Sequence, residues 1–165
     1  MNTILQKSAI IIILVLLSFS SCTKDSNVGD KPTIIDSLLV NTKIVLQVYN
    51  FENTNGAIAI AIYNSSSSFN SETVFYQDTA VAVTATAMEI EIDNMQAGTY
   101  AISILHDENE NGEMEMGGFL NLIPQEGFGF SNNPSIGISE PTFEQCDFVL
   151  DLGQSVSVPI TLVYM

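Results

Sequence analysis

Oxygen-bearing side chains with an alternating spacing occur in residues 107–115, which read Asp-Glu-Asn-Glu-Asn-Gly-Glu-Met-Glu. Oxygens at relative positions 1, 3, 5 and 9, with glycine at position 6, match the first half of an EF-hand-type calcium loop. A tight turn at the glycine brings alternate side chains and the position-7 carbonyl around one hard cation. The segment therefore predicts a Ca²⁺ site with the ligands Asp107, Asn109, Asn111, Glu113 (through its carbonyl) and Glu115.

Two features separate this segment from an EF-hand. Position 12 is Gly118 instead of a bidentate Glu, and the flanking residues are typical of a strand and a glycine-rich coil, not of helices. A carboxylate from elsewhere has to complete the shell, and Glu126, Glu140 and Glu144 are the candidates. We expect a weak affinity, on the order of 10⁻⁴–10⁻³ M, as in extracellular modules. The alternative is a solvated acidic hairpin tip without a metal.

His106 is the only histidine and directly precedes the acidic segment. It continues the phase of the apolar residues before it, so we expect a partly buried side chain bonded to loop carbonyls or carboxylates. The functional alternatives are a transition-metal ligand beside Asp107 and a general base. They would make the protein a small metal-dependent hydrolase with its site around His106 and Asp107, although no Ser or Cys nucleophile is recognisably paired with the histidine.

The stretch after Pro124 is a second candidate site. In a structural interpretation, its aromatic rings fix a long loop on the sheet edge while its glycines take positive φ. In a functional interpretation, it forms a surface for a glycan or protein ligand from Glu126, Phe128, Phe130, Ser131 and Asn132. Nucleotide binding is not favoured, because the third glycine of G-x-G-x-x-G is absent and no helix follows.

The N-terminus predicts export and lipid attachment. The apolar run 9–17 is too short for a membrane anchor of about 20 residues, but it has the length of a signal-peptide core. Small residues and then Cys22 follow, which resembles the lipobox of bacterial lipoproteins, where the cysteine receives acyl chains such as palmitate. The alternative is an ordinary secretory signal with a chance cysteine. We expect a signal peptide at 1–21 and a lipidated Cys22 with a flexible tether at 22–41.

Thr23 follows the cysteine where an Asp would favour retention at the inner membrane. By resemblance to known sorting rules, we expect an outer-membrane lipoprotein that faces the periplasm or the cell surface. The protein has a net charge of −15, with 4 Lys and Arg against 19 Asp and Glu residues. Phosphate binding needs clustered cations, so nucleic acid is excluded as a partner and the membrane is expected as a partner through the lipid anchor alone.

Residues 42–165 alternate between apolar and small or polar residues, the period-two pattern of half-buried strands. We expect about seven strands, at 43–50, 56–63, 79–85, 87–93, 99–106, 143–150 and 155–164. Short strands without helices predict an all-β fold, an antiparallel two-sheet β-sandwich of immunoglobulin-like or prealbumin-like type. Pro159 places the last strand at an edge or a bulge. We expect residues 107–142 to form one long Gly-rich loop without strand character. We also expect Cys146 to be a buried thiol in a strand.

Three segments in this order are familiar: 98–100 (Gly-Thr-Tyr), 106–112 (His-Asp-Glu-Asn-Glu-Asn-Gly) and 124–133 (Pro-Gln-Glu-Gly-Phe-Gly-Phe-Ser-Asn-Asn). Their succession resembles domain-of-unknown-function family 2141, exported bacterial β proteins, over roughly residues 43–165. The resemblance implies a β-sandwich on an exported protein, with no established activity. We therefore predict a binding or structural module without catalytic residues, and the hydrolase is the alternative.

Overall fold

The computed structural model describes residues 41–69, 71, 75–137 and 139–165. Ser37–Met165 forms one compact unit. The described strand pairings and core contacts all lie within this unit, so it contains what it needs to fold independently. The predicted signal peptide, Cys22 and the tether up to residue 40 lie outside the described residues.

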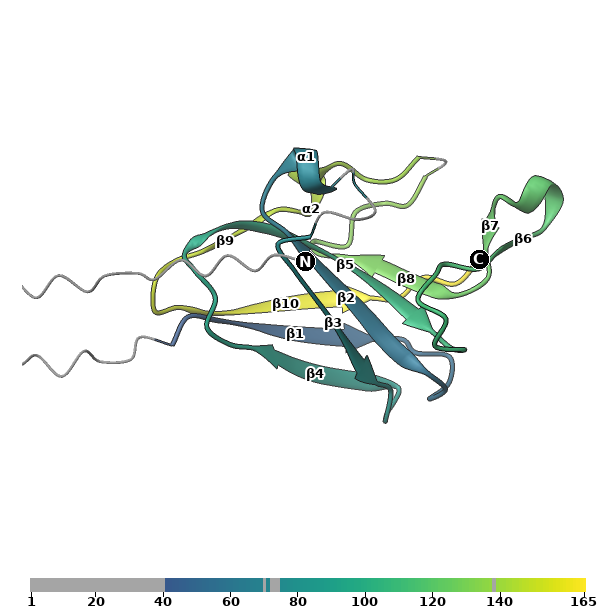
Figure 1. Ribbon diagram of the computed structural model, residues 1–165, viewed down its shortest axis with the longest axis horizontal. Helices are drawn as coiled ribbons and strands as arrows, with labels where there is room; N and C mark the ends of the chain where they lie inside the picture. Colours follow the sequence, from purple (N-terminus) through teal and green to yellow (C-terminus); the bar gives the residue numbers. More distant parts are fainter. Residues whose placement is uncertain (1–40, 70, 72–74, 138) are drawn as a thin grey trace, which may run out of the picture. The chain divides into compact units, whose positions relative to one another are not determined.

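The described residues are predominantly β, which confirms the predicted fold class (Figure 1). Short helical segments are α1 (Ser66–Phe69), α2 (Phe143–Cys146) and the 3-10 turn η1 (Phe119–Asn121). The strands are β1 (Lys43–Tyr49), β2 (Ala57–Tyr63), β3 (Gln77–Ala82), β4 (Ala87–Ile92), β5 (Gly98–Asp107), β6 (Met116–Gly117), β7 (Ile123–Pro124), β8 (Gly127–Phe130), β9 (Phe148–Leu150) and β10 (Ser155–Thr161).

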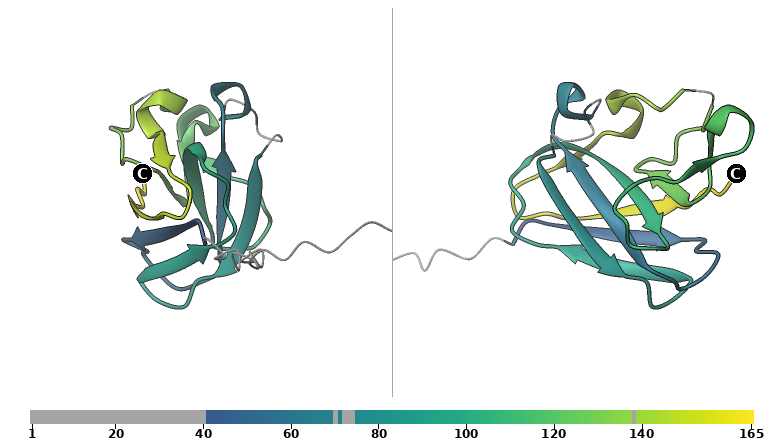
Figure 2. Two further views of the ribbon diagram at one scale, coloured as in Figure 1. Left: turned by 90° about the vertical axis from the view of Figure 1, so that its left-hand side faces the viewer. Right: turned by 45° about the vertical axis from the view of Figure 1, so that its right-hand side comes forward.

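Within the described residues, the strands form two main sheets and one small hairpin (Figure 2). One sheet has the order β10-β1-β4, and the other has the order β3-β2-β5-β8, with β9 also paired to β5. The pairing is antiparallel except between β1 and β10, which run parallel from Lys43↔Ser155 to Tyr49↔Thr161. β10 is an edge strand of its sheet, as expected from Pro159. A proline has no backbone N–H, so it cannot donate a hydrogen bond to a second neighbouring strand.

The core lies between the two main sheets and is built by the alternating residues that the sequence pattern predicted. β1, β2, β5 and β10 direct alternate side chains inward over most of their length, and most outward positions are small or polar. Val45, Tyr49 and Leu105 are larger hydrophobic side chains among the outward positions. The fully buried side chains from both sheets include Ile44, Leu46, Ile58, Ile60, Ile62, Ile102, Ile160 and Leu162. Burying each large aliphatic side chain contributes about 1.5–3 kcal/mol, so this interface is the main source of stability.

Two sequence predictions on the C-terminal half were wrong. Residues 107–142 are not free of strands, because they contain β6, β7 and β8, and β8 pairs with β5 from Ser103↔Phe130 to His106↔Gly127. Residues 143–150 are not one strand, because their first half is helix α2. The Gln145 side chain accepts a 2.8 Å hydrogen bond from the Thr142 backbone N–H, one half of the capping box that begins a helix.

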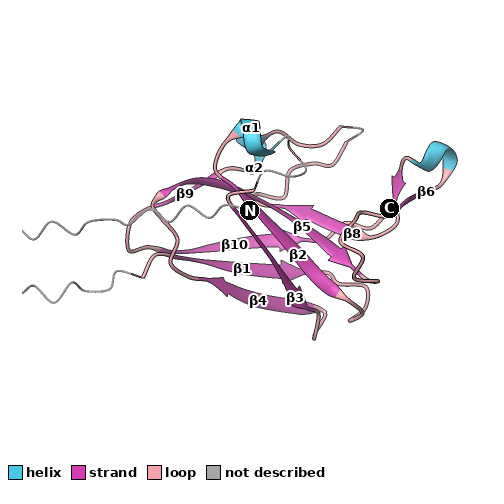
Figure 3. Cartoon of the chain, viewed as in Figure 1, coloured by secondary structure: helices cyan, strands magenta, loops and turns pink. Residues whose placement is uncertain are grey.

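The hairpin β6–η1–β7 projects from one end of the sandwich, beyond the acidic segment that follows β5 (Figure 3). Its two strands pair with each other and with neither main sheet among the described residues. Of the helical segments that the structure describes, none has the length and apolar character needed to cross a membrane.

Candidate functional site

The predicted metal segment is a loop between the end of β5 and the start of β6, and Asp107 anchors its turn. The Asp107 side chain is buried, and its two oxygens accept backbone hydrogen bonds from Asn111 (3.1 Å) and Gly112 (2.8 Å). Gly112 has φ of 78°, in the left-handed region that glycine adopts without strain. The turn at position 6 of the motif therefore forms as the spacing predicted.

The next polar side chains of the loop converge on Glu115. Asn109 Oδ1 and Asn111 Oδ1 accept backbone hydrogen bonds from the residues two positions ahead, at 3.0 and 2.9 Å. Their amide nitrogens face Glu115 Oε1 at 2.6 and 3.5 Å, respectively. The Glu113 side chain is exposed, and this residue contributes to the loop through its backbone N–H, which donates to Asn111. The structure thus brings Asn109, Asn111 and Glu115 together on the solvent side of the turn that Asp107 holds.

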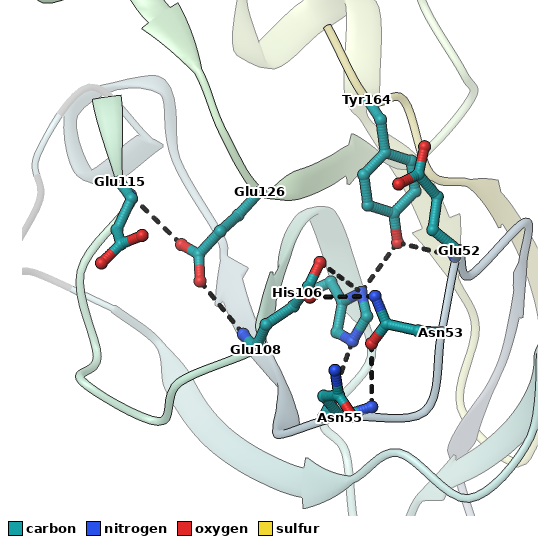
Figure 4. Close-up of polar contacts among 8 residues, drawn as sticks. All are labelled: Glu52, Asn53, Asn55, His106, Glu108, Glu115, Glu126 and Tyr164. Carbon is teal, nitrogen blue, oxygen red and sulfur yellow. Dashed lines mark hydrogen bonds and ion pairs between the residues drawn. The ribbon is translucent and has the colours of Figure 1, made fainter. Parts of the chain in front are cut away.

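Glu126 closes the base of this loop from the neighbouring segment. Its carboxylate is buried, and Oε1 and Oε2 accept hydrogen bonds from the backbone N–H groups of Glu108 (3.0 Å) and Glu115 (3.1 Å), as Figure 4 shows. Charged acceptors make backbone hydrogen bonds of about 1.5–3 kcal/mol each. Glu126 therefore fixes the two ends of the acidic loop to each other and to the start of β8.

The other two candidate carboxylates lie elsewhere. Burial raises the pKa of the Tyr63 phenol, and the nearby Glu140 carboxylate adds to this effect. Tyr63 pairs with Ala101, whereas the acidic loop starts at Asp107, at the opposite end of the β2–β5 ladder. Glu144 belongs to α2, whose Phe143 packs on Phe69 of α1. Of the three candidates, Glu126 alone is seen in contact with the loop.

Few of the carboxylates in the loop are placed to act as ligands for a hard cation. In the described part of the chain, no group of three or more His, Cys, Asp or Glu side chains is placed to hold a metal ion. The available ligands are the carboxylates of Asp107 and Glu115 together with amide and backbone oxygens. Each amide oxygen has a second lone pair beside the hydrogen bond it accepts, so the donor set suits Ca²⁺ in type. A cation would have to displace the amide N–H groups that now face Glu115.

His106 has a partner for each ring nitrogen (Figure 4). The side chain is 0% exposed, Nδ1 lies 2.7 Å from Tyr164 Oη, and Nε2 lies 2.9 Å from the backbone oxygen of Asn55. A carbonyl oxygen only accepts, so the proton is assigned to Nε2, and Nδ1 accepts from the Tyr164 hydroxyl. This arrangement confirms the expected histidine bonded to a loop carbonyl. A reaction that used His106 as a base would first have to break one of these two bonds.

Tyr164 connects His106 to the segment that begins at Glu52, next to the acidic loop. Its hydroxyl also accepts a 3.2 Å hydrogen bond from the Glu52 backbone N–H. Burial is the main cause that raises the pKa of Tyr164, and the carboxylates of Glu108 and Glu52 add to it. Beside this pair, Asn53 Nδ2 donates to Glu108 Oε2 at 2.9 Å. Sequence reasoning did not include Tyr164, Asn53 or Asn55 in the site, although the inward phase of Tyr164 in its strand was visible.

The candidate ligand surface lies mainly in β8 and its ends, where its residues have structural partners. Ser131 is fully buried and accepts the Ile102 backbone N–H at 2.9 Å while donating to the Cys146 carbonyl at 2.6 Å. Asn132 is exposed and donates to the Asp147 carbonyl. Phe128 and Phe130 are partly buried and lie edge to face with each other, and Phe130 also contacts Phe69.

The glycines of β8 do not take positive φ, contrary to the structural interpretation given above. These positions must be small because side chains from the C-terminal segment pack directly on them. A Cβ on Gly127 would lie 2.3 Å from the Tyr164 ring, and one on Gly129 would lie 2.7 Å from Ile160. Close packing of the C-terminal segment against β8 therefore explains this glycine pattern.

Cys146 is fully buried, in α2, and belongs to a small cluster with Tyr63, Ala101 and Phe143. The buried thiol was predicted correctly, although its strand was not. Burial raises the pKa of the Cys146 thiol to about 11, and the Asp147 carboxylate adds to this shift. Such a thiol stays protonated at neutral pH and is a poor nucleophile.

A family model described as an uncharacterized protein conserved in bacteria (DUF2141) matches residues 46–158. This range includes the acidic loop, Glu126 and His106. No curated protein and no solved structure matched the chain.

Proposed function

The chain belongs to the DUF2141 family of uncharacterized bacterial proteins, and we propose that it acts as a calcium-stabilised β-sandwich module, held to the cell envelope by a lipid at Cys22. The module binds or braces other envelope components and carries out no catalysis. The calcium site consists of Asp107, Asn109, Asn111, the Glu113 carbonyl and Glu115.

One observation carries the calcium proposal: the Asn109 and Asn111 side chains meet at Glu115 Oε1 while Asp107 holds the turn beneath them. The side chains of positions 3, 5 and 9 thus lie together on the solvent side of the turn, and the carboxylate of position 1 lies at its base. Ca²⁺ affinity rises with the number of charged ligands and with the rigidity of the site. Two carboxylates on a clamped loop fit a weak site that is filled at millimolar extracellular calcium.

The acidic surroundings support a cation at this place. Glu108, Glu110 and Glu113 add negative charge to the loop, and no Lys or Arg follows Lys43 in the sequence. Lys43 pairs with Glu91 at 2.6 Å, on β1 and β4. Because the described part of the loop has no basic partner, a bound dication would relieve the repulsion among its carboxylates.

Thermal unfolding of the unit Ser37–Met165 tests the proposal. Ca²⁺ at millimolar concentration should raise the unfolding temperature relative to excess chelator, since a ligand that binds only the folded state stabilises it. Mg²⁺ at the same concentration should have a smaller effect, because it demands near-ideal octahedral geometry. An unfolding temperature that does not respond to Ca²⁺ contradicts the proposal.

The loop offers a matched pair of variants. Glu115→Gln and Glu113→Gln each remove one negative charge from the same loop, but the Glu113 side chain is not among the ligands. Glu115→Gln should abolish the Ca²⁺ effect, and Glu113→Gln should retain most of it. Equal losses in both variants would indicate a general effect of charge and would refute the assigned ligands.

The lipid anchor is tested separately in the full-length chain. Cys22→Ala should leave the protein unacylated and move it from the detergent phase to the aqueous phase, because the acyl chains provide the attachment. Persistent partitioning of this variant into detergent would refute lipidation at Cys22 and would leave the calcium site unaffected.

A further inference from the structure

The hairpin β6–η1–β7 carries an exposed apolar tip, which we define as Met116, Phe119, Leu120, Leu122 and Ile123. Phe119 is 83% exposed, Leu120 71% and Leu122 68%, and the remaining two are about 40% exposed. Exposed apolar side chains are ordinary when scattered, but a contiguous group at the end of a projecting hairpin is characteristic of a contact surface.

The backbone of the tip supports this interpretation. Leu120 and Asn121 both have positive φ, at 60° and 57°. A leucine in the left-handed region is uncommon, and such conformations concentrate where a function requires them. Residues 116–125 also contain no charged side chain, although acidic residues immediately precede and follow them. The tip can therefore leave water without burying a charge.

A protein partner fits this tip poorly. Its exposed apolar side chains offer on the order of 500 Å², whereas a standard interface needs roughly 800 Å² from each partner. A second copy of the chain would bring two acidic loops together, and their like charges would repel. The hairpin also has no Trp, Tyr or Arg, the residue types that dominate the binding energy of protein interfaces.

We propose that the apolar tip inserts into the interfacial layer of a lipid bilayer with neutral headgroups. A narrow projection of Phe and Leu side chains can enter the headgroup and acyl boundary, about 5–10 Å deep, without burying unpaired backbone in the hydrocarbon. The acidic loop beside the tip repels anionic headgroups, which selects a zwitterionic surface. This inference is independent of the calcium site and of the lipid at Cys22.

Vesicle binding by the unit Ser37–Met165 tests the proposal. The probe is phosphatidylcholine vesicles in excess chelator, with binding measured by co-sedimentation. Phe119→Ser and Leu122→Ser should each weaken binding about tenfold or more, since each removes a large apolar side chain from the inserted surface. Replacing part of the phosphatidylcholine with phosphatidylglycerol should weaken binding of the unmodified unit.

Two other exposed apolar residues provide the control. Val149 in β9 and Leu152, just after it, are 62% and 74% exposed. β9 pairs with the start of β5, whereas the hairpin follows the end of β5, and Figure 1 shows β9 at the end of the sandwich away from the hairpin. Val149→Ser and Leu152→Ser should leave vesicle binding unchanged. Equal losses at both ends would show nonspecific adsorption and would overturn the assignment to the tip.

A fluorescent reporter locates the contact directly. The chain has no tryptophan, so Phe119→Trp and Leu152→Trp each introduce a single reporter. Vesicles should shift the emission of Phe119→Trp to shorter wavelength and leave that of Leu152→Trp unchanged. Absence of vesicle binding by the unmodified unit overturns the proposal. So does a dimer in sedimentation analysis that Phe119→Ser dissociates, since this result would assign the tip to a second copy.

Discussion

The carboxylate of Glu126 accepts a 3.1 Å hydrogen bond from the backbone N–H of Glu115, eleven residues earlier in the chain. The other oxygen of the same carboxylate accepts the Glu108 N–H, so one buried side chain ties both ends of the acidic loop. The loop thereby has a fixed base, and its solvent side, where Asn109, Asn111 and Glu115 meet, is the proposed cation site.

Glu126→Gln should lower the free energy of unfolding by about 1–3 kcal/mol. The amide keeps one acceptor oxygen but places an N–H group where the second backbone N–H now donates, which leaves a buried donor without a partner. Urea denaturation of the unit Ser37–Met165 in excess chelator measures the change. Glu113→Gln is the control and should have an effect within about 0.5 kcal/mol, because its side chain is exposed. Equal stability of Glu126→Gln and the unmodified unit would contradict the clamp.

Tyr164→Phe should destabilise the domain by about 1–3 kcal/mol. The change removes the hydroxyl that donates to His106 Nδ1 and leaves a buried ring nitrogen without a hydrogen bond. Tyr49→Phe is the matched control, because Tyr49 is 43% exposed and should be nearly neutral. Nitrogen NMR of the imidazole should also find the proton on Nε2 in the unmodified unit. A proton on Nδ1 would reverse the assigned direction of the Tyr164 hydrogen bond.

Gly127→Ala should destabilise the domain by about 1–3 kcal/mol, because the added methyl group overlaps the Tyr164 ring and forces the C-terminal segment away from β8. Gly137→Ala is the comparison, since its Cβ would meet nothing within 4 Å. Thermal unfolding of the two variants separates close packing from a general need for glycine. Similar effects at both positions would argue against packing as the cause.

The buried Cys146 thiol should make the free energy of unfolding fall at alkaline pH. Because burial raises the thiol pKa to about 11 in the folded state from 9.0, the unfolded chain releases the proton first as the pH rises. Stability is thus fully retained below about pH 9 and falls between pH 9 and 11, by up to roughly 2–3 kcal/mol. Cys146→Ala should flatten this fall while leaving the tyrosine titrations in place. Urea unfolding at several pH values makes the comparison, and parallel curves would contradict it.

The sequence predicted the elements whose signal is local. β1, β2, β5 and β10 alternate over most of their length and were placed within one to three residues. The burial of His106 followed from the phase of β5. β8 was missed because glycine occupies half of its positions, and the side chains that require those glycines, Tyr164 and Ile160, come more than thirty positions later. Helix α2 was missed because two buried apolar residues, Phe143 and Cys146, within so short a segment fit a strand as well as a single helical turn.

The part of the site that could not be predicted depends on distant contacts. Asp107 and Gly112 are five residues apart, and their hydrogen bond follows from the motif. Glu126 bonds to the backbone at both ends of the loop, at Glu108 and Glu115. Residue spacing alone does not tell which of the three candidate glutamates makes these bonds. The parallel pairing of β1 with β10 is likewise set by the overall topology and not by either strand's own pattern.

The most direct test of the account is a crystal structure of Ser37–Met165 grown with millimolar Ca²⁺. Calcium binding by this loop predicts a density peak at 2.3–2.6 Å from oxygens of the proposed ligands, which are Asp107, Asn109, Asn111, the Glu113 carbonyl and Glu115. The Asn109 amide should be turned from its present contact with Glu115. Anomalous scattering identifies the ion. Loop density without such a peak, with the Asn109 amide still bonded to Glu115 Oε1, would contradict calcium binding by this loop.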